Sequence, residues 1–196
     1  MRYLALPNII AAERSSAPAL LSTLTVAFAA DPVFRFWWPE PAEYLKVWPS
    51  FALAMGERGF DAKTVLATSD ARAVAFWLPP GIEANPEQIA ALDLGGSPED
   101  DEIARELRSE MDRYHPAAPH WYLWLIGVDP IAQGRGLGSH LLRHTLATCD
   151  ELGEIAYLES SDPSNVPFYE RHGFEPLAEI RVRDVPVVTP MIRHPR

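Results

Sequence analysis

The sequence contains a single cysteine, Cys149, and no apolar run long enough to cross a bilayer. One cysteine cannot form an internal disulfide, and no metal-ligand spacing surrounds it, which is typical of a reducing compartment. A membrane-spanning helix needs roughly 20 consecutive apolar residues. We therefore expect a cytoplasmic protein that has no membrane partner.

Positive charge is also scarce. The chain has 17 Lys and Arg residues against 27 Asp and Glu residues, which gives a net charge of −10 at pH 7. Such a charge repels phosphate backbones and anionic lipid surfaces, so we expect no nucleic-acid partner. The 196 residues, 47% of them hydrophobic, are sufficient for one domain with its own core.

An uncharged segment over residues 17–30 admits two interpretations. It contains Ala27-Phe28-Ala29, a small-residue pattern like that of a signal-peptide cleavage site. However, Glu13 precedes the segment and Pro18 opens it, which favours a buried helix over an export signal. We expect Ser15 or Ser16 to cap this helix, and its buried face to hold Leu20, Leu21, Leu24 and Phe28.

The rest of the chain alternates between strand-like and helix-like patterns, which predicts an α/β domain on a mixed sheet. Before residue 120 the expected elements are a strand over 1–6, a helix near 42–58, a hairpin over 63–68 and 73–78, and a helix that Ser97 or Asp100 caps. From residue 120 onward, the expected elements are strands over 120–128 and 154–160, helices over 134–152 and 165–172, and closing strands over 174–183 and 185–193.

The most informative segment is the turn that follows the strand over 120–128. The strand ends at Pro130, and Gly134, Gly136 and Gly138 open a long helix. The first N–H groups of a helix have no partner within it, and glycines let an anionic group approach them closely. This pattern predicts a site for a diphosphate, although a glycine-opened helix without a ligand is the alternative.

Three known phosphate-binding patterns share features with this turn. The Walker pattern requires Lys and then Ser or Thr after its last glycine, whereas Leu137 follows Gly136 here. The dinucleotide fingerprint requires G-x-G-x-x-G, and this turn has G-x-G-x-G. The remaining pattern, Gln-x-x-Gly-x-Gly from Gln133, resembles the acyl-CoA pyrophosphate loop of the GNAT family of N-acetyltransferases.

A second block strengthens this resemblance. Residues 164–174 are similar to the block of Asn, Tyr and Gly-Phe that follows the fifth strand in that family, and here they supply Asn165, Tyr169 and Gly173-Phe174. Within the family the likeness is to the puromycin N-acetyltransferase branch. Residues 120–123 and the pair Leu158-Glu159 also contribute to this likeness.

The resemblance implies a fold and an organisation. The fold is a mixed, mostly antiparallel central sheet that is flanked by helices and splayed between strands 4 and 5. A single domain over residues 1–196 would have an acceptor-side half at 1–119, with a helical insert at 82–118. The acetyl-CoA-binding half would lie at 120–196.

The resemblance also implies acetyl-CoA as co-substrate and a set of residues that bind it. Asn165 would hold the pantetheine amides with packing from Phe168, and the N–H of Val128 would support the thioester carbonyl oxygen, provided that Gly127 marks a local irregularity of the strand. The complete set is Ile126, Gly127, Val128, Gln133, Gly134, Arg135, Gly136, Leu137, Gly138, Ser139, Asn165 and Phe168.

Aminolysis of a thioester requires a neutral amine, and an alkyl amine has a pKa of about 10.4. Exposing its lone pair at pH 7 costs roughly 4 to 5 kcal/mol unless a base takes the proton. We expect Glu159 to be this base, directly or through a water chain, although it could instead bind an ammonium group or cap the next loop. His120 is a weaker candidate, because it lies at the opposite end of its strand.

Tyr169 is the expected general acid for the departing thiolate, since a phenol with a pKa of about 10 keeps its proton at pH 7. The alternative is a tyrosine that only packs on the sheet.

His140 and His144 share a helix face, but no third ligand is evident, so we expect no metal. An aromatic group forms either core or an acceptor pocket for an apolar or aromatic amine, and its members are Phe34, Phe36, Trp37, Trp38, Trp48 and Phe51.

The sequence thus predicts an enzyme, an N-acetyltransferase that moves an acetyl group from acetyl-CoA to a primary amine by direct attack in a ternary complex. We expect the acceptor to be a small molecule. A protein lysine or N-terminus is the alternative acceptor, and a non-catalytic acyl-CoA-binding module is the alternative of another class. A nucleotide-dependent kinase is disfavoured, because the lysine that grips phosphates is missing. A homodimer remains open.

Overall fold

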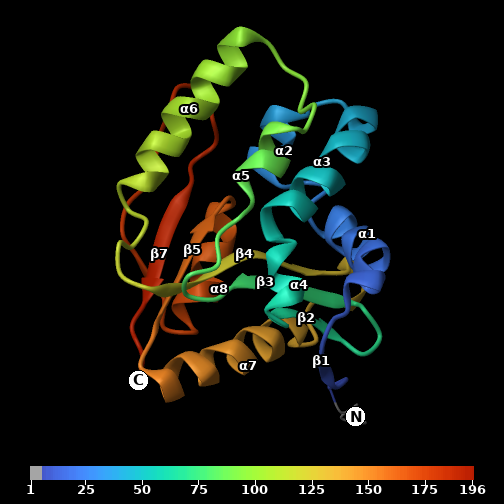
Figure 1. Cartoon of the computed structure of the whole chain (residues 1–196), viewed down its shortest axis with the longest axis vertical. Helices are drawn as coiled ribbons and strands as arrows, with labels where there is room; N and C mark the ends of the chain where they lie inside the picture. Colours follow the sequence, from blue (N-terminus) through green and yellow to red (C-terminus); the bar gives the residue numbers. More distant parts are fainter. Residues whose placement is uncertain (1–5) are drawn as a thin grey trace.

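The computed structural model describes residues 6–196, which form one mixed sheet with the strand order β1-β2-β3-β4-β5-β7-β6 (Figure 1). β4 and β5 run parallel, and every other pair in this sheet is antiparallel. The predicted mixed, mostly antiparallel sheet is therefore confirmed. Its strands are β1 (Ile9–Ala11), β2 (Val65–Thr68), β3 (Ala73–Leu78), β4 (His120–Val128), β5 (Ile155–Ser160), β6 (Glu175–Pro176) and β7 (Thr189–Arg193).

Helices cover both faces of the sheet. The first face carries α1 (Ala17–Ala27), α2 (Pro32–Trp37), α3 (Pro41–Gly56) and α4 (Arg58–Asp61). The second face carries α7 (Leu137–Leu152), which lies below the sheet in Figure 1. Because successive side chains of a strand point to opposite faces, Phe76 of β3 joins the first core and Trp77 joins the second.

A third, smaller core lies under α6 (Pro98–Asp112), which follows the short helix α5 (Pro86–Ala90). Ile103 and Leu107 of α6 pack with Val33 of α2 and with the segment 180–188. Ser97 caps the α6 helix: its hydroxyl accepts from the N–H of Asp100, while the Asp100 carboxylate accepts from the N–H of Ser97. This capping box confirms the predicted cap and holds α6 over one end of the sheet.

The parallel pair β4 and β5 separates after a short contact. Its register includes only residues 120–122 of β4 and residues 155–157 of β5. From Leu123 and Leu158 onward the two strands no longer pair with each other. The predicted splay is therefore confirmed, and it opens a gap in the sheet towards the carboxyl ends of both strands.

A bulge lies in β4 beside this gap. Consecutive residues of β3, Phe76 and Trp77, pair with Leu125 and Leu123, so Trp124 is an extra residue in β4. As a result Trp124 and Leu125 both face the helices of the first face, although they are neighbours in sequence. The bulge therefore turns the Trp124 ring towards the side on which α3 lies.

Several elements differ from the predicted ones. The strand expected over 1–6 lies outside the described residues apart from Leu6, which precedes β1. The side chain of Ser16 makes no capping hydrogen bond, because a 3-10 turn, η1 (Arg14–Ser16), leads directly into α1. The closing strands are shorter than expected, since Pro176 has no N–H for the sheet and residues 180–188 pack against α6 instead.

Candidate functional site

The glycine turn after β4 is held in place from its start. Asp129 accepts the N–H of Ile131 at 3.1 Å and opens a 3-10 turn, η2 (Pro130–Ala132). The Asp129 carboxylate also forms a 2.9 Å ion pair with Arg72, next to β3. The Gln133 side chain donates to the carbonyl of Val128 at 3.2 Å, so it ties the turn back to the end of β4.

The N-terminus of α7 is open. Gly136, the residue before the first turn, has φ +82° and supplies no side-chain cap, and that turn contains no acidic residue. A Cβ at Gly134 or Gly136 would meet no atom within 4 Å. An anion can therefore approach the uncapped amides, which the helix dipole favours. The residues present fit the diphosphate of a coenzyme A.

The N–H of Val128 points towards the splay. The N–H of the next residue, Asp129, donates to the carbonyl of Arg72 at 2.8 Å, on the β3 side of β4. Backbone groups of successive residues in a strand point to opposite edges. The Val128 amide is therefore directed to the edge where β4 has already separated from β5.

The prediction that β4 is locally irregular at Gly127 is wrong. Gly127 pairs regularly with Val74, and the bulge lies at Trp124 instead. The space available explains why a glycine occupies position 127, because a Cβ there would lie 2.8 Å from Leu24 and 2.9 Å from Ala27. Gly127 therefore lets α1 cross closely over β4.

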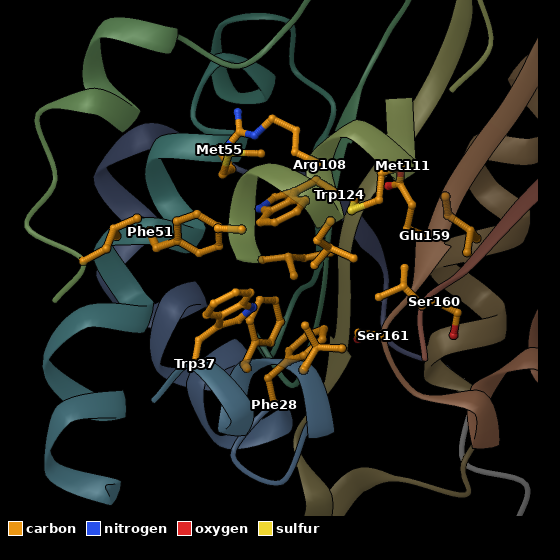
Figure 2. A pocket seen from close by; sticks show the side chains of 18 of the residues that line it. Phe28, Trp37, Phe51, Met55, Arg108, Met111, Trp124, Glu159, Ser160 and Ser161 are labelled. Carbon is orange, nitrogen blue, oxygen red and sulfur yellow. The ribbon is translucent and has the colours of Figure 1, made fainter. Parts of the chain in front are cut away.

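A cavity of about 420 Å³ lies between the first-face helices, α6 and the splay (Figure 2). Figure 2 shows the rings of Phe28, Trp37, Phe51 and Trp124 gathered around it, with Glu159 and Ser160 on the opposite side. Two aromatic side chains are fixed by hydrogen bonds, since the indole of Trp38 donates to the Leu94 carbonyl and that of Trp124 donates to the Ala52 carbonyl. The cavity therefore has a preformed aromatic wall.

The aromatic group of the sequence is divided between core and cavity. Trp48 is fully buried and belongs to the core. Phe36 packs beside Trp37 against the third core. The members that line the cavity are Phe34, Trp37, Trp38 and Phe51. Phe34 and Trp38 also belong to the first core, so both interpretations of the group hold and these two residues satisfy both.

Charge along the cavity is predominantly negative. The acidic side chains in its lining are Asp100, Asp101, Asp112 and Glu159, whereas Arg108 is the one guanidinium among the lining residues. The first three come from α6, the helical insert predicted at 82–118. This distribution favours a cationic or protonated ligand.

The two predicted catalytic side chains both border this cavity. Glu159 is on β5, and Tyr169 is on the short helix α8 (Val166–Glu170) that follows the 3-10 turn η3 (Pro163–Asn165). Both line the cavity, together with Asn165 and Ile126. Phe168 lies beside the α7 N-terminus, where its ring is 3.5 Å from the position of a Cβ at Gly138. Residues from distant motifs are thus assembled at one site.

Glu159 is largely buried, with 6% of its side chain exposed. Its Oε1 lies 3.5 Å from Nδ1 of His115, and its Oε2 is buried without a hydrogen-bond partner in the protein. Burial, followed by the negative charge of Glu159, raises the pKa of the Tyr157 and Tyr122 phenols. Glu159 lines the cavity, and a carboxylate in this position is suited to accept a proton from a bound ligand.

Tyr169 keeps its proton more firmly than a free phenol. Burial, and secondarily the charge of Asp31, raises its pKa above the ordinary value. Asp31 is buried and accepts the N–H groups of Val33 and Phe34, each at 3.0 Å, and its other oxygen accepts from the Ser161 hydroxyl. Burial raises the pKa of Asp31 as well. The phenol is therefore a proton donor and not a base at neutral pH.

Several residues of the site were not predicted. Asp31 was identifiable in part, since Asp followed by Pro is a typical helix start, and it begins the unpredicted helix α2. Ser161 and His115 carry no sequence signal. His120 was expected to be only a weaker base candidate at the opposite end of its strand, yet its Nε2 lies 3.0 Å from Nε2 of His115, whose Nδ1 is 3.5 Å from Glu159.

The remaining predictions concern metal and thiol chemistry. Within residues 6–196, no three or more His, Cys, Asp or Glu side chains are grouped so that they could hold a metal ion. The absence of a metal stays a prediction. Cys149 is buried in α7, and burial raises its pKa to about 12, which makes it unreactive. Over the same part of the chain, no helix has both the length and the apolar character to span a membrane.

Comparison with known proteins identifies similar chains. The model of the acetyltransferase (GNAT) family matches residues 36–174. An uncharacterized N-acetyltransferase of Schizosaccharomyces pombe is 43% identical over 54 residues, which are 28% of this chain and 22% of that protein. The match thus spans less than a quarter of the yeast protein.

Solved structures extend the similarity to the whole chain. A histone acetyltransferase HPA2 and related acetyltransferase from Corynebacterium glutamicum is 27% identical with a TM-score of 0.68, and 98% of each chain is covered. The polyamine N-acetyltransferase of Drosophila melanogaster, which forms N-acetylagmatine, is 14% identical with a TM-score of 0.56. That alignment covers 95% of this chain and 99% of the fly protein.

Proposed function

Because the chain belongs to the acetyltransferase (GNAT) family, we propose that it moves an acetyl group from acetyl-CoA to a primary amine of a small molecule. The observation that carries this proposal is that Glu159 and Tyr169 line one cavity. Glu159 is suited to take a proton from an amine, and Tyr169 is suited to give a proton to a thiolate. Transfer occurs by direct attack within a ternary complex.

The acetyl-CoA site extends from the cavity to the start of α7. The open amides of residues 137–139 and the glycine turn would hold the diphosphate, with Arg135 adding positive charge. Asn165 and Phe168 would hold the pantetheine arm along α8. When bound, acetyl-CoA supplies the acetyl group as an activated thioester.

Three groups of the chain support the reaction. Glu159 accepts the proton that the bound ammonium group must lose, since its carboxylate lines the cavity. The N–H of Val128, directed into the splay, stabilises negative charge on the carbonyl oxygen. The Tyr169 phenol holds a proton for the departing sulfur.

The acceptor is an amine that carries a flat, apolar body. The cavity of about 420 Å³ is within the range of small-molecule sites. Its aromatic wall suits a ring or another apolar group, and its carboxylates suit the ammonium end. The α6 helix covers the cavity, which favours a small molecule over a protein lysine or N-terminus. The small-amine substrate of the fly neighbour is consistent with this class.

A free-thiol assay tests the proposed reaction. The protein is incubated with acetyl-CoA and a panel of amines that includes aryl alkylamines, aminonucleosides, amino acid amides, aliphatic polyamines and a lysine peptide. We expect thiol release with small amines that carry a ring. Binding of acetyl-CoA without turnover on any amine would support the non-catalytic module instead, and turnover of the peptide alone would support a protein acceptor.

A matched pair of variants tests the diphosphate site by calorimetry. Gly136 has φ +82°, and Asn and Asp tolerate this left-handed conformation best among residues with a side chain. We expect Gly136→Asp to abolish acetyl-CoA binding and Gly136→Asn to weaken it much less, because the two differ in charge. Gly153→Asp, at φ +68° after the other end of α7, controls for backbone strain. Equal binding by both Gly136 variants would contradict this site.

A further inference from the structure

Glu159 stands at the inner end of a row of titratable side chains that leads out of the cavity. Nδ1 of His115 lies 3.5 Å from Oε1 of Glu159, and Nε2 of His115 lies 3.0 Å from Nε2 of His120. We propose that this row is a proton relay, in which His115 takes the proton from Glu159 and releases it through His120 to solvent. The inference rests on the proposed function, in which Glu159 accepts the amine proton.

Two contacts define the hydrogen positions on the imidazoles. The carbonyl of Ala118 lies 2.8 Å from Nδ1 of His120, so that nitrogen carries a proton. The Nε2–Nε2 contact of 3.0 Å then needs one proton, which a neutral His115 supplies from its Nε2. Nδ1 of such a His115 carries no proton and lies 3.5 Å from Oε1 of Glu159, at an ion-pair distance. This nitrogen can therefore take a proton that Glu159 releases.

Tyrosines pack around the relay. The rings of Tyr122 and Tyr157 contact the imidazole of His115, and the pKa of both phenols is raised, so they stay neutral. The charged side chains of Arg108 and Asp112, both on α6, also line the cavity. The N–H of His115 donates to the Met111 carbonyl, which fixes its position after α6.

The outer end of the row is open to solvent. The side chain of His115 is 37% exposed, and His120 is half-buried. Burial, and secondarily the neighbouring His115, lowers the pKa of His120, which favours release of a proton that reaches it. The side chain of Glu159, by contrast, is only 6% exposed.

Each step of the relay is a balanced proton transfer. The ammonium N–H bond breaks as an O–H bond forms on Glu159, and this bond breaks as an N–H bond forms at Nδ1 of His115. The N–H bond at Nε2 of His115 then breaks as the proton passes to Nε2 of His120 or to water. One proton leaves per amide formed, so Glu159 returns to the carboxylate for the next turnover.

Removal of the His115 imidazole tests the relay. We expect His115→Ala to lower kcat at pH 7 by about 10- to 100-fold, less than the loss of a positioned acid–base group. Added imidazole should restore much of this rate, and the defect should shrink as the pH rises, because hydroxide can then take the proton from Glu159. Binding of acetyl-CoA should be unchanged. His144→Ala, on an exposed face of α7, is the control under the same imidazole concentrations.

The opposite results overturn the proposal. A His115→Ala enzyme with the wild-type rate and pH profile, or one whose loss imidazole does not restore, would leave His115 without a relay role. If the variant does not fold, NMR titration of the wild-type imidazoles decides. Coupled titration of His115 and His120 that changes in Glu159→Gln supports the relay, and independent titration refutes it. A wild-type protein that acetylates no amine refutes the proposed function instead.

Discussion

At the scale of single residues, the site depends on two side chains whose protonation states differ because their surroundings differ. Tyr169 lines the cavity, and burial followed by the charge of Asp31 raises its pKa, so its phenol retains its proton. Glu159 is also buried, but it has an imidazole at one oxygen and no partner at the other. This pairing of a donor with an acceptor suits an exchange of protons with one bound amine and one thiolate.

The role of the Tyr169 hydroxyl can be measured directly. We expect Tyr169→Phe to lower kcat by about 10² to 10⁴, since a positioned acid contributes that much, while the Kd for acetyl-CoA changes little. Because the pKa of Tyr169 is raised, we also expect no loss of wild-type activity from its ionisation up to pH 10. Tyr114→Phe, at a half-buried tyrosine beside α6, is the control. Equal turnover by both variants would remove Tyr169 from the chemistry.

At the scale of elements, the site depends on close packing of α1 and α7 against the sheet. Gly127 lets α1 approach β4, and the open start of α7 is presented just beyond the end of β4. The far end of α7 is fixed as well. Arg193 of β7 donates to both carboxylate oxygens of Asp150 at 2.8 Å and to the His172 carbonyl at 3.0 Å.

The packing of α1 against β4 makes Gly127 intolerant of a side chain. We expect Gly127→Ala to lower the free energy of unfolding by about 1–3 kcal/mol, because its Cβ would overlap Leu24 and Ala27. Gly138→Ala is the matched control, since its Cβ would meet Phe168 and Val128 only at 3.5 and 3.6 Å. Denaturant unfolding of the two variants should differ, with Gly138→Ala equal to or more stable than the parent. Equal stability losses would contradict the packing argument.

The Asp150 ion pair gives a prediction with a defined pH dependence. We expect Asp150→Asn to lower the free energy of unfolding at pH 7 by about 1.5–3 kcal/mol, because it leaves the buried Arg193 without its charged partner. Hydrogen bonds from Arg193 lower the pKa of Asp150. Its contribution is therefore complete above the unfolded-state pKa of about 3.9 and is lost as the pH falls through the lower folded-state value.

Unfolding curves at several pH values check this expectation. The difference between parent and Asp150→Asn should be constant near neutral pH and should decrease below about pH 4. Asp184→Asn, at an exposed aspartate, should change little at any pH. A difference that persists unchanged at low pH would mean that the carboxylate charge is not its source.

At the scale of the whole molecule, the cavity is assembled from segments that are far apart in the sequence. Phe28 comes from α1, Trp37 from α2, Phe51 from α3, Trp124 from β4 and Glu159 from β5, and α6 covers them (Figure 2). The splay of β4 from β5 leaves room for a ligand between the aromatic wall and the carboxylate. The acceptor preference is thus a property of the assembled fold.

The aromatic wall is tested by steady-state kinetics on Trp37→Ala. We expect KM for amines that carry a ring to rise roughly tenfold, which corresponds to about 1.4 kcal/mol of lost contact. KM for acetyl-CoA and for a short aliphatic amine should change much less. Trp37→Phe, which keeps an aromatic ring, should recover most of the affinity. A uniform rise of KM for every amine would show that Trp37 supports the fold and not the acceptor.

The sequence by itself determined the family, the mixed sheet and its splay, and the segments that contain Glu159 and Tyr169. It did so because glycine turns, caps and strand patterns are local, and because the Gln133 turn and the Asn165 block lie in fixed order along the chain. The puromycin branch, the homodimer and the cytoplasmic location stay predictions. Only the tertiary structure decided that the bulge lies at Trp124 and that the aromatic group is divided between core and cavity. It also placed His115 beside Glu159 and His120 beside His115, because contacts between distant segments depend on how helices pack on the sheet, which local pattern does not encode.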